Sequence, residues 1–185
     1  LVLIASEAPA QPIVAPPPPT LTDAPADVQE AEPARPRNGF SAKVSVGPRY
    51  QDLHGHAIWS GAPAVAFGAQ FKDVGAIHGD FSVGVGNTDG GLMTSAFAFG
   101  PTWEFILGAW RLGGGPQLSV IWMTRASNGG TMVATGACGV AFAGIDLVQG
   151  ETTSLHLGLD GRLGRVGDMN HASVGLSLGV RFKTP

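Results

Sequence analysis

The chain has 185 residues, which is enough for one ordinary domain with a sizeable core. Glycine accounts for 28 residues and charged residues for only 14%, against about 7% and about 25% in soluble proteins. This argues against helical bundles and coiled coils, because each glycine inside a helix costs about 1 kcal/mol relative to alanine. A formal net charge of −3 leaves no basic footprint for nucleic acid, and the single cysteine, Cys138, excludes an internal disulfide framework and a thiolate metal cluster.

The composition changes near residue 38. Residues 1–37 hold nine of the 14 prolines, no glycine and no aromatic residue. The segment also carries five acids and two bases, so the net charge of −3 belongs to it and the remainder is formally neutral. Such a stretch cannot bury enough apolar surface to offset its ordering entropy, so we expect residues 1–38 to be a disordered Pro/Ala-rich tail. Its apolar start, Leu1–Ala5, followed by the small residues Ala8–Ala10, resembles the end of a signal peptide and its cleavage site.

Residues 39–185 alternate between apolar and small or polar residues with a period of two. This period is typical of strands with two unlike faces, and the pattern predicts eight strands. Their apolar sets, in chain order, are Phe40, Ala42, Val44 and Val46; Val65, Phe67, Ala69 and Phe71; Ile77, Phe81, Val83 and Val85; Phe97, Phe99, Trp103 and Phe105; Trp110, Leu112, Leu118, Val120 and Trp122; Cys138, Val140 and Phe142; Leu155, Leu157, Leu159 and Leu163; and Ala172, Val174, Leu176, Leu178, Val180 and Phe182.

The connections between these segments also alternate in length. Asp89-Gly90 and Asn128-Gly129 are strong hairpin signals. Short turns at one end and longer loops at the other predict an up-and-down antiparallel barrel with two different rims. The short links are expected around Asp73–Gly75, Leu107–Gly108 and Val148–Gly150, and the longer ones at Gln51–Gly61, Asn87–Gly91, Arg125–Gly130 and Arg165–Asn170.

The residues opposite the apolar sets distinguish a membrane barrel from a soluble one. A soluble barrel points its apolar set inward, and its water-facing rows normally carry many lysines, glutamates and threonines. Here the opposite rows consist of Gly, Ala, Ser and Thr, which fit a narrow eight-stranded interior, so the sequence predicts a transmembrane β-barrel with a polar lumen. The isolated charges in these rows are Lys43, Lys72, His78, Asp80, Glu104, Arg111, His156, Asp160, Arg162 and Arg181.

The aromatic residues of the apolar sets gather towards one rim. Tyr50, Trp59 and Trp122 lie towards the other rim. Such a distribution is typical of an aromatic girdle at the bilayer interface, and a soluble core has no reason to collect its rings at one end. The expected girdle consists of Phe40, Phe71, Trp103, Phe105, Trp110, Phe142 and Phe182.

Residues 39–185 thus resemble the small eight-stranded outer-membrane β-barrels of Gram-negative bacteria. Ser173–Phe182 is similar to the terminal strand that such proteins offer to the barrel-assembly machinery, although three residues follow Phe182. The resemblance implies an outer-membrane location, contact with outer-membrane lipid and lipopolysaccharide, and that machinery as a partner during insertion. We expect a structural or surface-interaction role without a cofactor, in which the tail is a periplasmic tether to a periplasmic or cell-wall partner.

The charges assigned to the lumen suggest a network that plugs it. A crowded interior requires pairing, since an unpaired buried charge is costly. The alternative is a gate or a narrow ion path, for which eight strands leave little room. The expected network consists of Lys43, Asp80, Glu104, Arg111, Asp160, Arg162 and Arg181.

Two histidine motifs are candidate sites. His54-Gly55-His56 offers two ligands where zinc wants three or four, so we expect a polar surface loop and no metal. His171-Ala172-Ser173 resembles the His-x-Ser of outer-membrane lipid A deacylases, which are also eight-stranded barrels. That family has a glutamate downstream, whereas here no acid follows Ser173, and Asp168 or Asp160 would have to orient the imidazole.

These observations leave a lipid-modifying hydrolase as a second hypothesis and a soluble barrel with an apolar ligand as a third. The uncharged stretch 126–145 is long enough for a membrane helix. Its dispersed glycines favour a hairpin followed by a strand. Cys138 shares the parity of Val140 and Phe142, so we expect it to face lipid.

Overall fold

The computed structural model describes residues 38–72, 74–88, 91–125 and 129–184. The expected tail and signal remnant lie outside these residues, apart from Asn38. Asp89, Gly90 and Asn128 of the two hairpin signals also lie outside them. Among the described residues, no helix is long and apolar enough to span a membrane.

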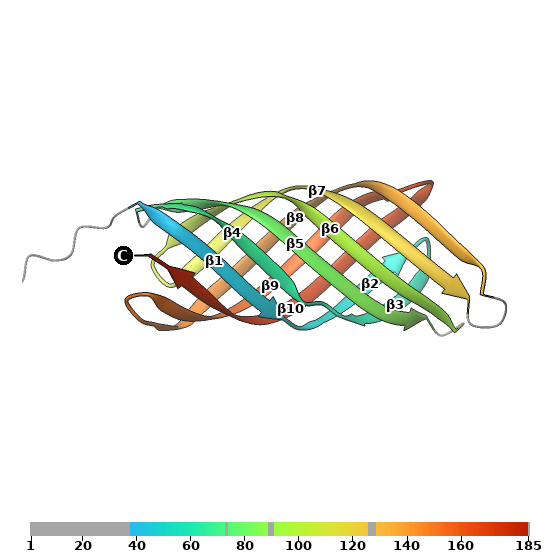
Figure 1. The fold of residues 1–185 in the computed structure, drawn as a ribbon, viewed down its shortest axis with the longest axis horizontal. Helices are drawn as coiled ribbons and strands as arrows, with labels where there is room; N and C mark the ends of the chain where they lie inside the picture. The colour runs from blue at the N-terminus through green and yellow to red at the C-terminus, as the bar shows by residue number, and fades with distance from the viewer. Residues whose placement is uncertain (1–37, 73, 89–90, 126–128, 185) are drawn as a thin grey trace, which may run out of the picture. The chain divides into compact units, whose positions relative to one another are not determined.

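The described residues form antiparallel strands that close into a ring (Figure 1). The ring closes because the last strand pairs with the first, for example Val180 with Val44. All neighbours in the ring are antiparallel, as expected for an up-and-down order. The strands are β1 (Gly39–Val46), β2 (Pro48–Leu53), β3 (His56–Gly61), β4 (Ala64–Phe71), β5 (Gly75–Thr88), β6 (Leu92–Leu107), β7 (Trp110–Arg125), β8 (Thr131–Gln149), β9 (Thr153–Val166) and β10 (Met169–Lys183).

Ten labelled strands make an eight-membered ring because two members are interrupted. Gly47 separates β1 from β2, which both pair with β10, and Ala62 and Pro63 separate β3 from β4, which both pair with β5. Prolines break the ladder at these points because they have no N–H to donate. Ala62 N still donates to Gly47 O at 2.8 Å, and Val83 N donates to Pro63 O at 2.9 Å. The prediction of an all-β, eight-stranded up-and-down barrel is therefore confirmed.

Two of the four longer loops were predicted wrongly. Most of Gln51–Gly61 belongs to β2 and β3, which are joined at His54 and Gly55, both with positive φ. Arg165–Asn170 narrows to a turn at Gly167 and Asp168. These segments were misread because their strands continue beyond the apolar stretches with polar side chains. The short turns after β4, β6 and β8 lie where the sequence placed them.

The outer face of the ring is apolar and the inner face is mostly polar. Phe67, Ile77, Leu118 and Leu178 are each 49–58% exposed on the outside, although they are large hydrophobic residues. At the end of the ring where β2 meets β3, the interior is instead apolar, with Leu53, Ile58, Ile121 and Val166 in one buried cluster. The structure thus has the inverted arrangement of faces that the alternation predicted.

Candidate functional site

The buried polar side chains line the middle of the ring. All seven residues of the expected network lie on this inner face. Lys72, another charge that the alternation assigned to the inner rows, does not lie there. Lys72 is exposed in the turn after β4, with φ of +50°, and its N–H donates to Asn38 Oδ1 at 3.1 Å. The alternation assigned Lys72 to the inner rows, but β4 ends at Phe71, so Lys72 no longer follows the two-residue period of the strand. Buried side chains on the inner face include Ser41, Arg49, Gln51, His78, Thr102, Glu104, Arg111, Gln117, Asp146, His156, Arg162, His171 and Arg181.

Arg181 of β10 and Glu104 of β6 form a two-pronged ion pair across the interior. Arg181 Nη1 donates to Oε1 at 2.5 Å and Nη2 donates to Oε2 at 2.9 Å. The two residues are 2% and 3% exposed. A bidentate guanidinium–carboxylate pair fixes both position and orientation, so this pair joins opposite parts of the wall.

A second group joins β7, β8 and β9. Arg111 donates to Asp146 Oδ2 through Nε at 2.9 Å and through Nη2 at 2.5 Å. His156 Nδ1 lies 3.2 Å from the other carboxylate oxygen. Sequence reasoning included Arg111 but missed Asp146 as its partner, since the parity assumed for that strand did not point Asp146 inward.

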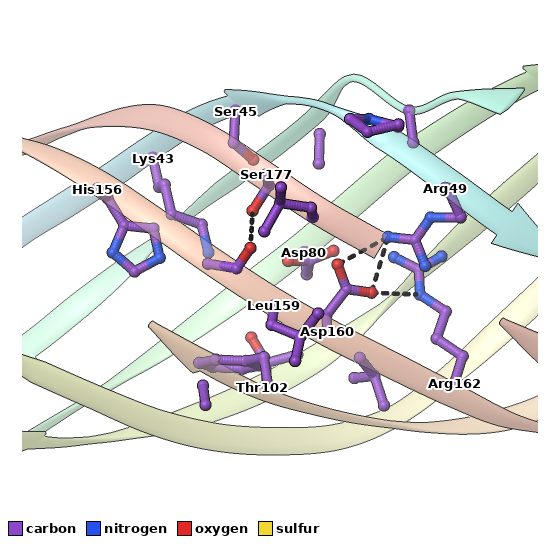
Figure 2. A pocket seen from close by; sticks show the side chains of 18 residues that line it. Lys43, Ser45, Arg49, Asp80, Thr102, His156, Leu159, Asp160, Arg162 and Ser177 are labelled. Atoms are coloured by element: carbon purple, nitrogen blue, oxygen red, sulfur yellow. Dashed lines mark hydrogen bonds and ion pairs between the residues drawn. The ribbon is translucent and has the colours of Figure 1, made fainter. Parts of the chain in front are cut away.

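A third group lies beside the interruption between β1 and β2. Arg49 Nη2 contacts the Asp160 carboxylate at 2.9 and 2.7 Å, and Nη1 donates to Ser173 Oγ at 3.2 Å. Arg162 Nε lies 3.8 Å from the same carboxylate. Figure 2 shows the two guanidinium groups on one side of Asp160. Arg49 was also missed, because its segment was read as the approach to a loop.

Lys43 and Asp80 line a cavity of about 40 Å³ in the interior (Figure 2). This volume has room for a few water molecules. Lys43 Nζ lies 5.3 Å from the centre of the Phe142 ring, and Asp80 accepts a hydrogen bond from Gln117 at 3.2 Å. Arg49, Asp160 and Arg162 also line the cavity.

The predictions for Phe142 and Cys138 are wrong, because both side chains face the interior. Phe142 pairs with Asp160 in β9, and a side chain on Gly113 would meet its ring tip at 2.5 Å. Cys138 is 5% exposed and lies 3.1 Å from Ser119 Oγ. The pairing of β8 with β7 and β9 turns the side chains of Cys138 and Phe142 inward. The outward row of β8 therefore consists of Ala137, Gly139, Ala141 and Ala143.

The other six residues of the expected girdle lie on the outer face at one rim. They are 46–58% exposed. They come from the start of β1 and β7 and the end of β4, β6 and β10, which share the rim with the short turns (Figure 1). At the opposite rim, Trp59 is 67% exposed and stacks edge-on with Tyr50 at 5.3 Å. The six are Phe40, Phe71, Trp103, Phe105, Trp110 and Phe182.

The structure does not assemble a catalytic triad at His171 and Ser173. Both side chains are buried on the inner face. Neither ring nitrogen of His171 has a hydrogen-bond partner. Asp160 is occupied by Arg49, and Asp168 is exposed in a turn. His54 and His56 are exposed at the β2–β3 turn, and the described residues hold no group of three or more His, Cys, Asp or Glu that could bind a metal.

Replacing His171 with leucine is expected to leave stability unchanged or to raise the free energy of unfolding by about 1 kcal/mol. The reason is that a buried polar ring without partners costs about 1–3 kcal/mol, and leucine removes this cost at similar volume. Urea titration of the refolded protein measures the change. A loss of 2 kcal/mol would mean that the imidazole makes hydrogen bonds that stabilise the fold.

No family model matches the chain, and no curated protein matches it. Among solved structures, Neisserial surface protein A aligns with a TM-score of 0.64 at 16% identity, covering 78% of this chain and 97% of its own. The chain has the fold of a small eight-stranded outer-membrane β-barrel.

Two further outer-membrane barrels show the same likeness. The attachment invasion locus protein Ail of Yersinia pestis aligns with a TM-score of 0.53 at 10% identity, covering 80% of this chain and 99% of its own. The N-terminal β-barrel domain of Pseudomonas aeruginosa OprF gives 0.50 at 15% identity, covering 79% and 100%. At these identities the likeness concerns the barrel fold alone, so the role of this barrel has to be argued from its own residues.

Proposed function

We propose that this protein is an outer-membrane barrel with a structural or surface-interaction role and a polar lumen that is plugged along the barrel axis. The observation that carries the proposal is the inversion of faces, with large apolar side chains outside and ion pairs inside. Six exposed aromatic rings at one rim support it, because such rings prefer the bilayer interface. The strands β5 to β10 have 14 to 19 residues, and about 9–11 suffice to cross the hydrocarbon core.

The closed lumen is supported by two layers of side chains. The Arg181–Glu104 pair crosses the interior towards the rim of short turns, and the Arg111–Asp146 pair lies along the wall between the neighbouring strands β7 and β8. The cluster of Leu53, Ile58, Ile121 and Val166 fills the interior towards the other rim. The cavity between them, at about 40 Å³, is small. This filling, together with a polar middle, also disfavours a soluble barrel that carries an apolar ligand.

The proposed orientation places the short turns in the periplasm and the opposite rim outside the cell. Gly39 begins β1 at the rim of short turns, so residues 1–38 would enter the periplasm as a tether. A surface role fits the names of two neighbours, a surface protein and an attachment protein. An enzymatic role finds no support in the partnerless imidazole of His171.

Heat-modifiable electrophoretic mobility tests the membrane barrel. The protein extracted in detergent should migrate differently before and after boiling, and it should fractionate with outer membranes. Photo-crosslinking from positions 16–19 in intact cells should capture a periplasmic or cell-wall partner. A detergent-free, water-soluble monomer would contradict the proposal, and crosslinks to external molecules alone would contradict the orientation.

A further inference from the structure

Two Gly-Pro dipeptides face each other across β6 and β7. The pairing of these strands is regular up to Phe99 with Leu118 and resumes at Trp103 with Gly114. Pro101 lies two residues after Phe99, and Pro116 lies two residues before Leu118, so the prolines stand opposite each other. Each is paired normally on its other side, Pro101 with Gly79 of β5 and Pro116 with Gly139 of β8. The interruption is therefore confined to one seam of the wall.

Both proline carbonyls point into this seam. Pro116 O lies 2.2 Å from where a Cβ on Gly100 would be, and Pro101 O lies 2.1 Å from the same position on Gly115. In a regular antiparallel ladder the opposite residue would donate its N–H to each of these oxygens. Here each opposite residue is a proline without an N–H. Two successive ladder hydrogen bonds are therefore missing at the same place.

The proline at the β3–β4 interruption is different. Pro63 is exposed on the outside like Pro101 and Pro116, but its carbonyl accepts a hydrogen bond from Val83 N at 2.9 Å. Its neighbour Ala62 donates to Gly47 O at 2.8 Å. The wall is thus held together at Pro63, and the β6–β7 seam is weak because two prolines coincide.

The seam lies between the interior cavity and the outer face. Thr102 of β6 and Val140 of β8 both line the cavity, and Gly115 lies between them in β7 without a side chain. On the outside, Phe99 and Trp103 flank Pro101 and are 45% and 49% exposed. At this point β7 therefore places no side chain between the backbone and the interior, and the rings of Pro101 and Pro116 cover the outer side.

We propose that the β6–β7 seam between Phe99–Leu118 and Trp103–Gly114 is a lateral opening, through which small molecules pass between the bilayer and the interior cavity. Carbonyls without donors inside a membrane cost several kcal/mol, so opening the seam to water or another donor costs less here than elsewhere in the wall. The inference rests on the proposed function only in that the outer face meets lipid.

Cys138 is a natural reporter for this opening. It is the single cysteine of the chain, faces the interior and pairs with Gln117, the residue after Pro116. The full chain in phospholipid vesicles is treated with a maleimide that partitions into the bilayer and, separately, with a charged methanethiosulfonate from water. The variants are Pro101→Ala/Pro116→Ala, each single substitution, and Pro63→Ala as the matched control.

The double variant should slow labelling by the bilayer-partitioning maleimide about 25-fold, because each of the two restored backbone hydrogen bonds shifts an equilibrium by about fivefold. Each single variant should give an intermediate rate, and Pro63→Ala should stay within about twofold of the wild type. The charged reagent should label Cys138 much more slowly, and its rate should not depend on the seam prolines. Equal rates in the wild type and the double variant, or equal slowing by Pro63→Ala, would overturn the proposal.

Amide exchange in detergent micelles gives a second readout that does not depend on the membrane role. The new N–H groups at positions 101 and 116 should be as protected as those of Phe99 and Leu118. Unprotected amides would show that the strands do not pair there even with donors, which overturns the inference. A failed heat-modifiability test with protected new amides would instead count against the proposed function.

Discussion

Replacing Arg181 with methionine is expected to lower the free energy of unfolding by about 3–5 kcal/mol. The substitution leaves Glu104, which is 3% exposed, without its two hydrogen bonds. Removing one partner of a buried ion pair is that costly because the remaining charge stays buried and uncompensated. Urea titration in phospholipid vesicles, followed by tryptophan fluorescence and by the mobility of unboiled samples, measures the change.

The double variant Arg181→Met/Glu104→Met removes both charges. It therefore distinguishes the net contribution of the ion pair from the cost of leaving one charge unpaired. It should recover most of the loss, since apolar residues of similar size can replace a buried pair at little net cost. Arg125→Met, at an exposed position in β7, is the control and should change stability by less than about 0.5 kcal/mol. A loss below 1 kcal/mol in Arg181→Met would show that the pair does not stabilise the barrel.

Arginine at Leu178 is expected to destabilise the barrel by about 2–4 kcal/mol in phospholipid vesicles. Leu178 lies in the middle third of β10 and is 49% exposed on the outer face. Burying a guanidinium in the hydrocarbon core has this cost near the bilayer midplane. If the outer face met water, the same change at an exposed position would cost less than about 0.5 kcal/mol.

The matched control is Leu163→Arg. Leu163 is 72% exposed on the same outer face but lies near the end of β9, three residues before Val166. The cost of a charge falls to about 0–1 kcal/mol near the interface, so Leu163→Arg should be the milder change. Equal, small effects at both positions would favour a soluble barrel over the proposed function.

Seven of the eight apolar sets were assigned to the correct face from the sequence, and the exception is instructive. In β10 one row contains apolar residues such as Leu178 and the other contains Arg181, so only the first row can form the apolar outer face. In β8 both rows are apolar or small, with Ala141 and Ala143 on one side and Val140 and Phe142 on the other. Hydropathy cannot choose between such rows. The choice is made by the neighbours, because pairing with Asp160 of β9 places Phe142 inside.

The irregular positions of the wall also could not be predicted from the alternation of apolar and polar residues. Asp146 continues the inner row of Phe142, but a bulge between Asp146 and Val148 turns Val148, which is 63% exposed, to the outside. One extra residue in a strand changes the parity of everything beyond it. The partner of Arg111 was missed for a different reason, because Asp146 precedes the bulge and shares the row of Phe142, which the sequence assigned to the outer face. The opposed prolines of the β6–β7 seam are likewise visible only once the register of the two strands is known.

The alternation of apolar with small or polar residues by itself determined the class of fold, the number of wall strands and the polarity of the two faces in seven of the eight. This was possible because alternation is a local property that any strand with two unlike surroundings must carry. Tertiary structure alone decided which charges meet. Arg181 and Glu104 are 77 residues apart and Arg49 and Asp160 are 111 apart, so their contact depends on the curvature and register of the closed barrel.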